Sequence, residues 1–323
     1  MNCPRLAIVG AGVIAEDHAR AALFAGFELV AVSAREGSTR AIKFAARHSI
    51  AGVYSSASDL IKSKKWDALL VCSATESLTA FTDAAIESGR PALVEKPVAL
   101  ESKDLLPLLE QDTQNIIVGY NRRHYSSVLA AKDFFERSEN VVISLEIPES
   151  VNADQSKTLL GFRSVLDNSV HMLDLLSYIA GPVVIKQVFP EPGKIRKTGS
   201  LLVGENSRGD LVTVKAVWNS PSNFSISLEN GHERFLLSPI ERGVIFRGLD
   251  VVEPSERNPI RTYSPNLVGE HNLSPIDESL KPGFGEQMVA FRSFIENGER
   301  PKTLASLQDG FDALVLAEKL LGK

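Results

Sequence analysis

Residues 7–20 read AIVGAGVIAEDHAR, a short apolar run that leads into Gly10 and Gly12 and then into a helical pattern. Gly10 permits a tight turn, Gly12 lets the backbone approach a pyrophosphate, and Ala15 keeps the helix close to the strand. The amino terminus of that helix offers N–H groups to phosphates. The stretch predicts a dinucleotide-binding turn, and a plain structural turn is the alternative. The candidate cofactor contacts here are Gly10, Gly12, Val13, Ile14 and Ala15.

Apolar runs alternate with amphipathic stretches through the first third of the chain. This rhythm predicts right-handed crossovers and a parallel sheet covered by helices on both faces, a doubly wound α/β (Rossmann) domain. We place this domain at residues 1–120. The predicted strands are RLAIVG (5–10), FELVAVS (27–33), DALLVCS (67–73), PALVEKP (91–97) and NIIVGY (115–120).

The rest of the chain is rich in branched and aromatic runs separated by turn residues, which predicts consecutive antiparallel strands. We expect residues 121–323 to form an α+β domain with an open, mainly antiparallel sheet, used for substrate binding and oligomerisation. A polar loop is expected at 253–282. The predicted helices are 102–111, 126–137, 168–179, 286–297 and 306–321, and the strands are VVISLEI (141–147), VVIKQVF (183–189), LVTVKAVW (211–218), FSISLE (224–229), ERFLLS (233–238) and GVIFRG (243–248).

Composition limits the classes of protein to consider. The 323 residues are 44% hydrophobic and 23% charged, as in soluble globular proteins with room for two cores. A net charge of −5 argues against a nucleic-acid partner. Cys3 and Cys72 are too few for a disulfide framework, which favours a reducing, cytoplasmic location. Neither a membrane-spanning stretch nor a signal peptide is evident.

The end of the second predicted strand favours NADP over NAD. An acidic residue is expected about 20 residues after the glycines in NAD-binding domains. Ser33, Ala34 and Arg35 stand there instead. Arg35, with Ser38 and Arg40, can bind a 2'-phosphate that a carboxylate would repel. The alternative is that both arginines are solvated loop charges.

Four motifs together resemble the glucose-fructose oxidoreductase and inositol dehydrogenase family (Gfo/Idh/MocA) over essentially the whole chain. They are GAGVIA (10–15), LVEKP (93–97), GYNRR (119–123) and DNSVH (167–171). The resemblance implies that Lys96 is the active-site lysine and that a cis bond precedes Pro97. It also implies that Asp167 and His171 are the catalytic aspartate and histidine.

Lys96 and Pro97 follow a predicted central strand. A bond before proline adopts the cis form at a cost of only about 0.5 to 1 kcal/mol, so a sharp turn is accessible there. The turn would aim Lys96 into the crevice at the carboxyl ends of the strands, where ligands bind. A surface lysine is the alternative. Further candidate cofactor contacts are Ser73, Ala74, Glu95, Lys96 and Pro97.

The family's TPxxxH pattern is absent, because Ala74 and Leu78 occupy the positions of its proline and histidine. Near DNSVH, GFRSVLD (161–167) stands in place of the family's usual glycine-rich lead, and Ser169 replaces the glycine between the aspartate and the histidine. The cleft is therefore expected to differ in shape from those of the better known sugar and cyclitol dehydrogenases.

Asp167 and His171 are four residues apart and share one helix face. With Lys96 they suit the proton half of hydride transfer from a secondary alcohol. The alternatives are a helix N-cap at residues 167–169 with an ordinary buried histidine, or a metal pair that lacks an obvious third ligand.

The segment after NIIVGY corresponds to one that lines the family's substrate cleft. Arg122 and Arg123 would bind a carboxylate or a nucleotide-sugar phosphate, or would form interdomain ion pairs instead. The candidate substrate contacts are Lys96, Tyr120, Asn121, Arg122, Arg123, Arg163, Asp167 and His171.

The expected activity is NAD(P)-dependent hydride transfer to or from a CH–OH carbon of a sugar, cyclitol or nucleotide-linked sugar. His171 would exchange the hydroxyl proton, Asp167 would orient His171, and Lys96 would polarise the oxygen. The rivals are a non-catalytic dinucleotide sensor and a reductase of imines or enones. Because LVTVKAVW and FSISLE alternate apolar residues, we also expect homo-oligomerisation through an apolar open face of the second sheet.

Overall fold

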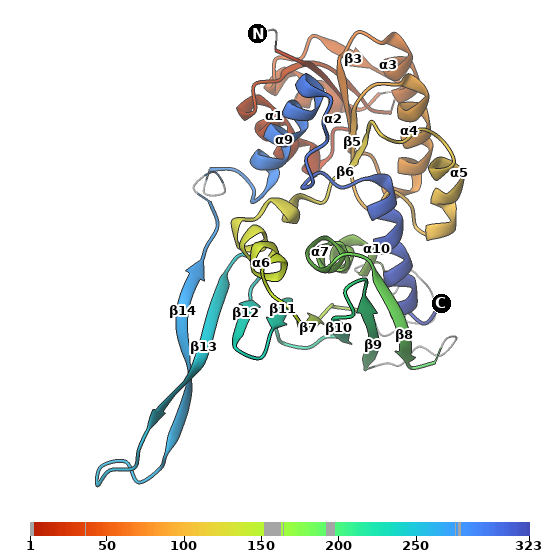
Figure 1. Cartoon of the computed structure of the whole chain (residues 1–323). Helices are drawn as coiled ribbons and strands as arrows, with labels where there is room; N and C mark the ends of the chain where they lie inside the picture. Colours follow the sequence, from red (N-terminus) through yellow and green to blue (C-terminus); the bar gives the residue numbers. More distant parts are fainter. Residues whose placement is uncertain are drawn as a thin grey trace. The chain divides into compact units, whose positions relative to one another are not determined.

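The computed structural model describes residues 3–35, 37–151, 163, 165–191, 198–274, 276 and 279–323. Gly161, Phe162 and Ser164 of the GFRSVLD lead lie outside the described residues. The chain forms two compact units (Figure 1): Met1–His124 with Ser274–Glu318, and Tyr125–Leu273 with Lys319–Lys323.

This division differs from a single boundary at residue 120. The segment 274–318 belongs to the first unit, partly because the amide of Val118 donates to the carbonyl of Ala305 at 2.9 Å. Local sequence patterns predict helices well but do not show which core a late helix joins.

The first unit contains a six-stranded sheet in the order β3-β2-β1-β4-β5-β6, with every pair parallel. This confirms the doubly wound prediction. The order reverses between β1 and β4, where ligands bind in such sheets. The strands are β1 (Arg5–Val9), β2 (Glu28–Ser33), β3 (Gly52–Tyr54), β4 (Ala68–Val71), β5 (Ala92–Val94) and β6 (Ile116–Val118).

The helix α1 packs on the sheet through an alanine-rich face, and α9 lies beside it (Figure 1). Small side chains on α1 leave space for Phe284, Met288 and Phe291 of α9 in the shared core. The helices of this part of the chain are α1 (Val13–Phe24), α2 (Thr39–Arg47), α3 (Ala57–Ser63), α4 (Thr75–Ser88), η1 (Ser102–Leu105), α5 (Leu106–Leu109), η2 (Asn121–His124), α9 (Phe284–Asn297) and α10 (Leu307–Leu320).

The second unit contains an eight-stranded sheet in the order β14-β13-β12-β11-β7-β10-β9-β8. Its strand pairs are antiparallel except for β7 with β10, so the sheet is mixed and mainly antiparallel, as predicted. The strands are β7 (Val142–Ile147), β8 (Val183–Phe189), β9 (Gly199–Asn206), β10 (Leu211–Val217), β11 (Ser225–Glu229), β12 (Glu233–Leu237), β13 (Gly243–Val252) and β14 (Thr262–His271).

The prediction of a loop throughout 253–282 was wrong, because β14 forms within it. Its sequence TYSPNLVGEH is polar and contains Pro265, which weakens the local strand signal. The strand exists because it pairs with β13 at the edge of the sheet. Beyond Arg247, the described pairing of β13 is with β14, and the two form a ribbon that extends from the sheet (Figure 1).

The helices α6 (Ser126–Glu136) and α7 (Val170–Ala180) lie on one face of this sheet (Figure 1). Three apolar residues of β10 are buried on that covered face: Val212, Val214 and Ala216. On the outer face Lys215 pairs with Glu146, and Thr213 bonds to a neighbouring serine. The outer face of β10 is therefore mixed, with Thr213 and Lys215 at its middle and the exposed Leu211 and Val217 at its ends.

Candidate active site

The glycine turn after β1 has the geometry that a pyrophosphate site requires. Gly10 has a φ of +99°, its amide donates to the carbonyl of Ser33 at 2.8 Å, and a Cβ at this position would collide with the carbonyl oxygen of Cys72. A Cβ at Gly12 would meet no atom within 4 Å. Gly12 is also the N-cap of α1, whose first residue, Val13, is 87% exposed. The helix terminus is thus open to a phosphate, as the cofactor needs.

The next loop carries the candidates for binding the ribose end. Arg35 and Arg40 are exposed, and Ser38 is the N-cap of α2, with its hydroxyl accepting from the amide of Ala41 at 3.4 Å. The first turn of α2 has no acidic residue. Ser33 is buried instead, and its hydroxyl has no hydrogen-bond partner among the described residues. Arg35, Arg40 and the amino terminus of α2 can therefore offer cationic side chains and backbone N–H groups to an anion.

The segment after β4 begins α4. Ser73 is half-buried and Ala74 is exposed, and the hydroxyl of Ser77 donates to the carbonyl of Ala74 at 2.8 Å. Leu78, which replaces the family's histidine, is only 1% exposed and packs in the core. Of this group, Ser73 and Ala74 are the residues that a ligand can reach.

Lys96 follows β5, and the bond between Lys96 and Pro97 is cis. Lys96 is half-buried, whereas Glu95 is buried. Glu95 Oε1 lies 2.6 Å from Nε2 of His18, and Glu95 Oε2 accepts from the backbone amide of Lys96 at 3.2 Å. Burial alone would raise the pKa of Glu95, but the hydrogen bond and charge of His18, together with Lys96, hold that pKa below its ordinary value.

The segment after β6 is the short helix η2. Arg123 is 2% exposed and pairs with Asp309 at 3.4 Å. Burial would raise the pKa of Asp309, but Arg123 and Ser306 hold it below its ordinary value. Burial also lowers the pKa of His124 to about 3, and the charge of Arg123 acts in the same direction. This geometry favours the ion-pair alternative for Arg123 over substrate binding. That alternative placed the pair between two domains, but both partners belong to the first unit.

The neighbours of Arg123 differ in exposure. Tyr120 and Asn121 are buried, and the side-chain amide of Asn121 donates to the carbonyl of Pro282 at 2.8 Å. Arg122 is half-buried. Of the two arginines, Arg122 is the one with more exposed surface for a substrate.

In the second unit, Asp167 and His171 occupy one continuous helical segment. Val165–Ser169 is π-helical and leads directly into α7. Such π turns often occur at functional sites. Asp167 is exposed and accepts from Nε of Arg163 at 3.0 and 3.2 Å, whereas His171 is 6% exposed. Arg163 therefore contacts the candidate catalytic carboxylate.

Ser169 does not act as a side-chain cap for α7. Its hydroxyl donates to Oε2 of the buried Glu149 at 2.6 Å, and the amide of Ser150 donates to Oε1 of the same carboxylate at 3.1 Å. This bond accounts for a serine where the family usually has glycine, and it removes Ser169 from the N-cap alternative.

Sequence reasoning missed His18 and Glu149. The signal for His18 was available, because it is the polar member of a buried α1 face that otherwise consists of Ala15, Ala19, Ala21 and Ala22. Glu149 gave no comparable local signal, since an acidic residue after a strand is ordinary.

Known proteins with similar sequences are dinucleotide-binding oxidoreductases. Residues 4–120 match the family model of the GFO_IDH_MocA oxidoreductases, described as an oxidoreductase family with an NAD-binding Rossmann fold. Inositol 2-dehydrogenase 2 of Saccharopolyspora erythraea is 27% identical over 237 residues, which is 68% of each chain. Over residues 4–120 the chain has the Rossmann domain of the Gfo/Idh/MocA oxidoreductase family.

Solved structures of similar fold extend the comparison to both units. UDP-N-acetylglucosamine 3-dehydrogenase from Acidithiobacillus ferrooxidans aligns over 99% of this chain and 97% of its own, with a TM-score of 0.73 and 16% identity. An oxidoreductase from Agrobacterium radiobacter, in complex with NAD+, L-tartaric acid and magnesium, aligns over 98% and 95%, with a TM-score of 0.72 and 16% identity. At these identities the likeness concerns the fold.

The matched part, residues 4–120, is thus an NAD(P)-binding Rossmann domain of the type found in these oxidoreductases. Gly10, Gly12 and the amino terminus of α1 fit the pyrophosphate of that cofactor. Within the described residues, no helix is both long and apolar enough to cross a membrane.

Proposed function

We propose that this Gfo/Idh/MocA enzyme transfers a hydride between NAD(P) and a CH–OH or C=O carbon of a sugar, cyclitol or nucleotide-linked sugar. The observation that carries the proposal is the position of Lys96, which is half-buried and follows β5 at the carboxyl edge of the parallel sheet, where ligands bind in such sheets. Relatives and fold neighbours named as inositol and UDP-sugar dehydrogenases support the class of substrate.

In the proposed mechanism the nicotinamide, when bound, accepts or supplies the hydride. Lys96 donates a hydrogen bond to the reacting oxygen and stabilises its developing negative charge. His171 takes the hydroxyl proton at an imidazole nitrogen during oxidation and returns it during reduction. Asp167 orients His171, and Arg163 holds the Asp167 carboxylate by the bonds at 3.0 and 3.2 Å.

We propose NADP as the preferred cofactor. Arg35 and Arg40 are exposed around the amino terminus of α2, and neither Ser33, the last residue of β2, nor Ala34 is a carboxylate. Both features favour a 2'-phosphate over a free ribose hydroxyl.

The substrate class is tested by measuring cofactor reduction with a panel of cyclitols, sugars and UDP-sugars, each with NADP+ and with NAD+. We expect turnover with at least one ring alcohol and a rate lower by about 10² to 10⁴ in a Lys96→Met variant. Cofactor binding without turnover on any alcohol, ketone, imine or enone would indicate the sensor, and turnover only on imines or enones would indicate the other reductase.

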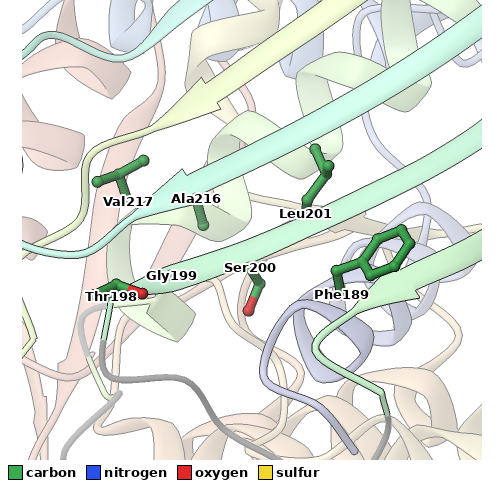
Figure 2. Close-up of a pocket in the computed structure, with 7 residues that line it drawn as sticks. All are labelled: Phe189, Thr198, Gly199, Ser200, Leu201, Ala216 and Val217. Carbon is green, nitrogen blue, oxygen red and sulfur yellow. The ribbon is translucent and has the colours of Figure 1, made fainter.

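We also propose that a second copy of the chain covers the outer face of the eight-stranded sheet. Apolar side chains remain exposed at the periphery of that face and on the β13–β14 ribbon. Phe189, Leu201 and Val217 line a recess of about 560 Å³ at the ends of β8–β10 (Figure 2). On the ribbon, Leu249 is 59% exposed and Tyr263 is 56% exposed. Isolated two-stranded ribbons are marginal in water, so a partner surface would stabilise this one.

The division of labour that we propose is cofactor binding in the first unit and substrate binding with oligomerisation in the second. We place the enzyme in the cytoplasm, because Cys3 and Cys72 are both free thiols.

A further inference from the structure

His18 is fully buried on the face of α1 that is otherwise built from alanines. Its ring packs against Phe284 of α9, with centroids 4.6 Å apart and planes inclined at 52°. Nε2 lies 2.6 Å from Oε1 of Glu95, whereas the buried Nδ1 has no hydrogen-bond partner in the described structure. An unsatisfied buried polar atom is unfavourable, so an ordinary core position would be filled better by an apolar ring. The bond to Glu95 distinguishes this position from such a core site.

Glu95 is fixed from several sides. Its amide donates to the carbonyl of Val71 in β4 at 2.9 Å, and a Cβ at Gly119 would lie 3.2 Å from Oε1. Oε2 accepts from the amide of Lys96 at 3.2 Å. A carboxylate buried in this way requires compensating partners. His18 supplies one of them from a different element of the sheet–helix unit.

We propose that His18 is a positioning residue for Lys96, which it holds through Glu95. The bond between His18 and Glu95 fixes the residue that immediately precedes the catalytic lysine and accepts from its amide. It also joins Lys96 to α1, the helix whose amino terminus meets the pyrophosphate. The proposal rests on the proposed function, because it assumes that Lys96 contacts the reacting oxygen.

The same helix offers a matched control. Nε2 of His48 lies 2.8 Å from Oε2 of Glu16 on α1, and the His48 ring packs on Phe44 with centroids 4.6 Å apart and planes at 50°. This pair joins the same two residue types and has the same type of aromatic neighbour, although Arg47 also contacts Glu16, and it does not involve β5. A general effect of losing a His–Glu pair would appear in both places.

The kinetic test compares Leu and Gln at each histidine, since Gln keeps an N–H donor and Leu does not. We expect His18→Leu to lower the single-turnover rate about tenfold or more, as small misplacements of catalytic groups do. The KM of the substrate and the Kd of NADPH should stay within about threefold of wild type, as expected for a loss confined to the reacting step. His18→Gln should recover most of the rate, and both His48 variants should match wild type. A normal rate in His18→Leu, or an equal loss in His48→Leu, would overturn the proposal.

A second readout does not depend on turnover. Reductive ¹³C-methylation gives each lysine an NMR signal, and Lys96→Met identifies that of Lys96 in the cofactor-free protein. We expect His18→Leu and Glu95→Gln to move this signal, and His18→Gln and His48→Leu to leave it in place. An unmoved signal in both His18→Leu and Glu95→Gln refutes the positioning role. If His18→Leu does not fold, the signal of Lys96 in Glu95→Gln decides whether the positioning role holds. An inactive wild-type protein would refute the proposed function only.

Discussion

The hydroxyl of Ser169 donates a 2.6 Å hydrogen bond to the buried carboxylate of Glu149 and so ties the π-helical turn that contains Asp167 to the residues that follow β7. We expect Ser169→Ala to destabilise the fold by about 1 to 3 kcal/mol, because Glu149 would lose a donor while remaining buried. Urea denaturation measures this loss. Ser220→Ala is the control, since that hydroxyl bonds only to Ser222 among its described contacts and at the surface. Equal effects in the two variants would contradict the role of Glu149.

The preference for NADP(H) is tested at Arg35. Arg35→Ala should weaken NADP(H) by about 1.5 to 3 kcal/mol, the contribution of a hydrogen bond to a charged group, and should leave NAD(H) nearly unchanged. Calorimetric titration of both cofactors measures the difference, with Lys65→Ala as a control for the loss of an exposed charge. Equal affinities of the wild type for the two cofactors would show that the interpretation of Arg35 is mistaken.

Lys96 and His171 should serve the chemical step rather than the fold. His171→Ala should lower alcohol oxidation by about 10² to 10⁴, the usual range for a general base, and Lys96→Met should cost a comparable factor. Oxidation by the wild type should fall toward acidic pH, because a protonated imidazole cannot accept a proton, and His171→Ala should lose that dependence. Single-turnover kinetics and melting temperatures of the same variants measure both effects.

The N-cap alternative predicts the opposite pattern for the same helix. Asp167→Ala would then lower stability by about 0.5 to 2 kcal/mol. His171→Ala would retain normal turnover, and that result would remove the assignment of the active site.

The buried imidazole of His124 should make stability depend on pH. Burial lowers its pKa from 6.5 to about 3, so below pH 6.5 the unfolded chain binds a proton that the native state does not. The buried imidazole therefore costs no stability above pH 6.5. As pH falls from 6.5 toward 3, the free energy of unfolding falls by about 1.4 kcal/mol per pH unit. Unfolding free energies at pH 7 and pH 5 should differ less in His124→Gln than in wild type. His232→Gln, at an exposed histidine, should keep the wild-type difference.

Self-association is tested by light scattering at micromolar concentration. We expect a dimer or larger oligomer, and we expect Leu249→Glu with Tyr263→Glu to shift it toward monomer, because both apolar side chains project from the β13–β14 ribbon. Lys323→Glu provides a control for added negative charge. A monodisperse wild-type monomer would rule out assembly through this unit.

The sequence alone determined the features that depend on local pattern. The glycine turn at Gly10 and Gly12, the parallel alternation of strands and helices, and the position of Lys96 after β5 all follow from neighbouring residues. Turn conformations and amphipathic periods involve interactions over a few residues, so they can be recognised from short stretches of sequence. The DNSVH helix belongs to the same class, although its first turn is π-helical rather than α-helical.

Only the tertiary structure decided which distant residues meet. His18 and Glu95 are 77 residues apart in sequence, and the apolar periodicity of α1 gives no information about which carboxylate its single buried ring will contact. The pairing of Arg123 with Asp309 and that of β14 with β13 likewise depend on where separate elements pack. A buried polar side chain must find a partner, but the identity of that partner is set by the packing of whole helices and strands, which local sequence does not encode.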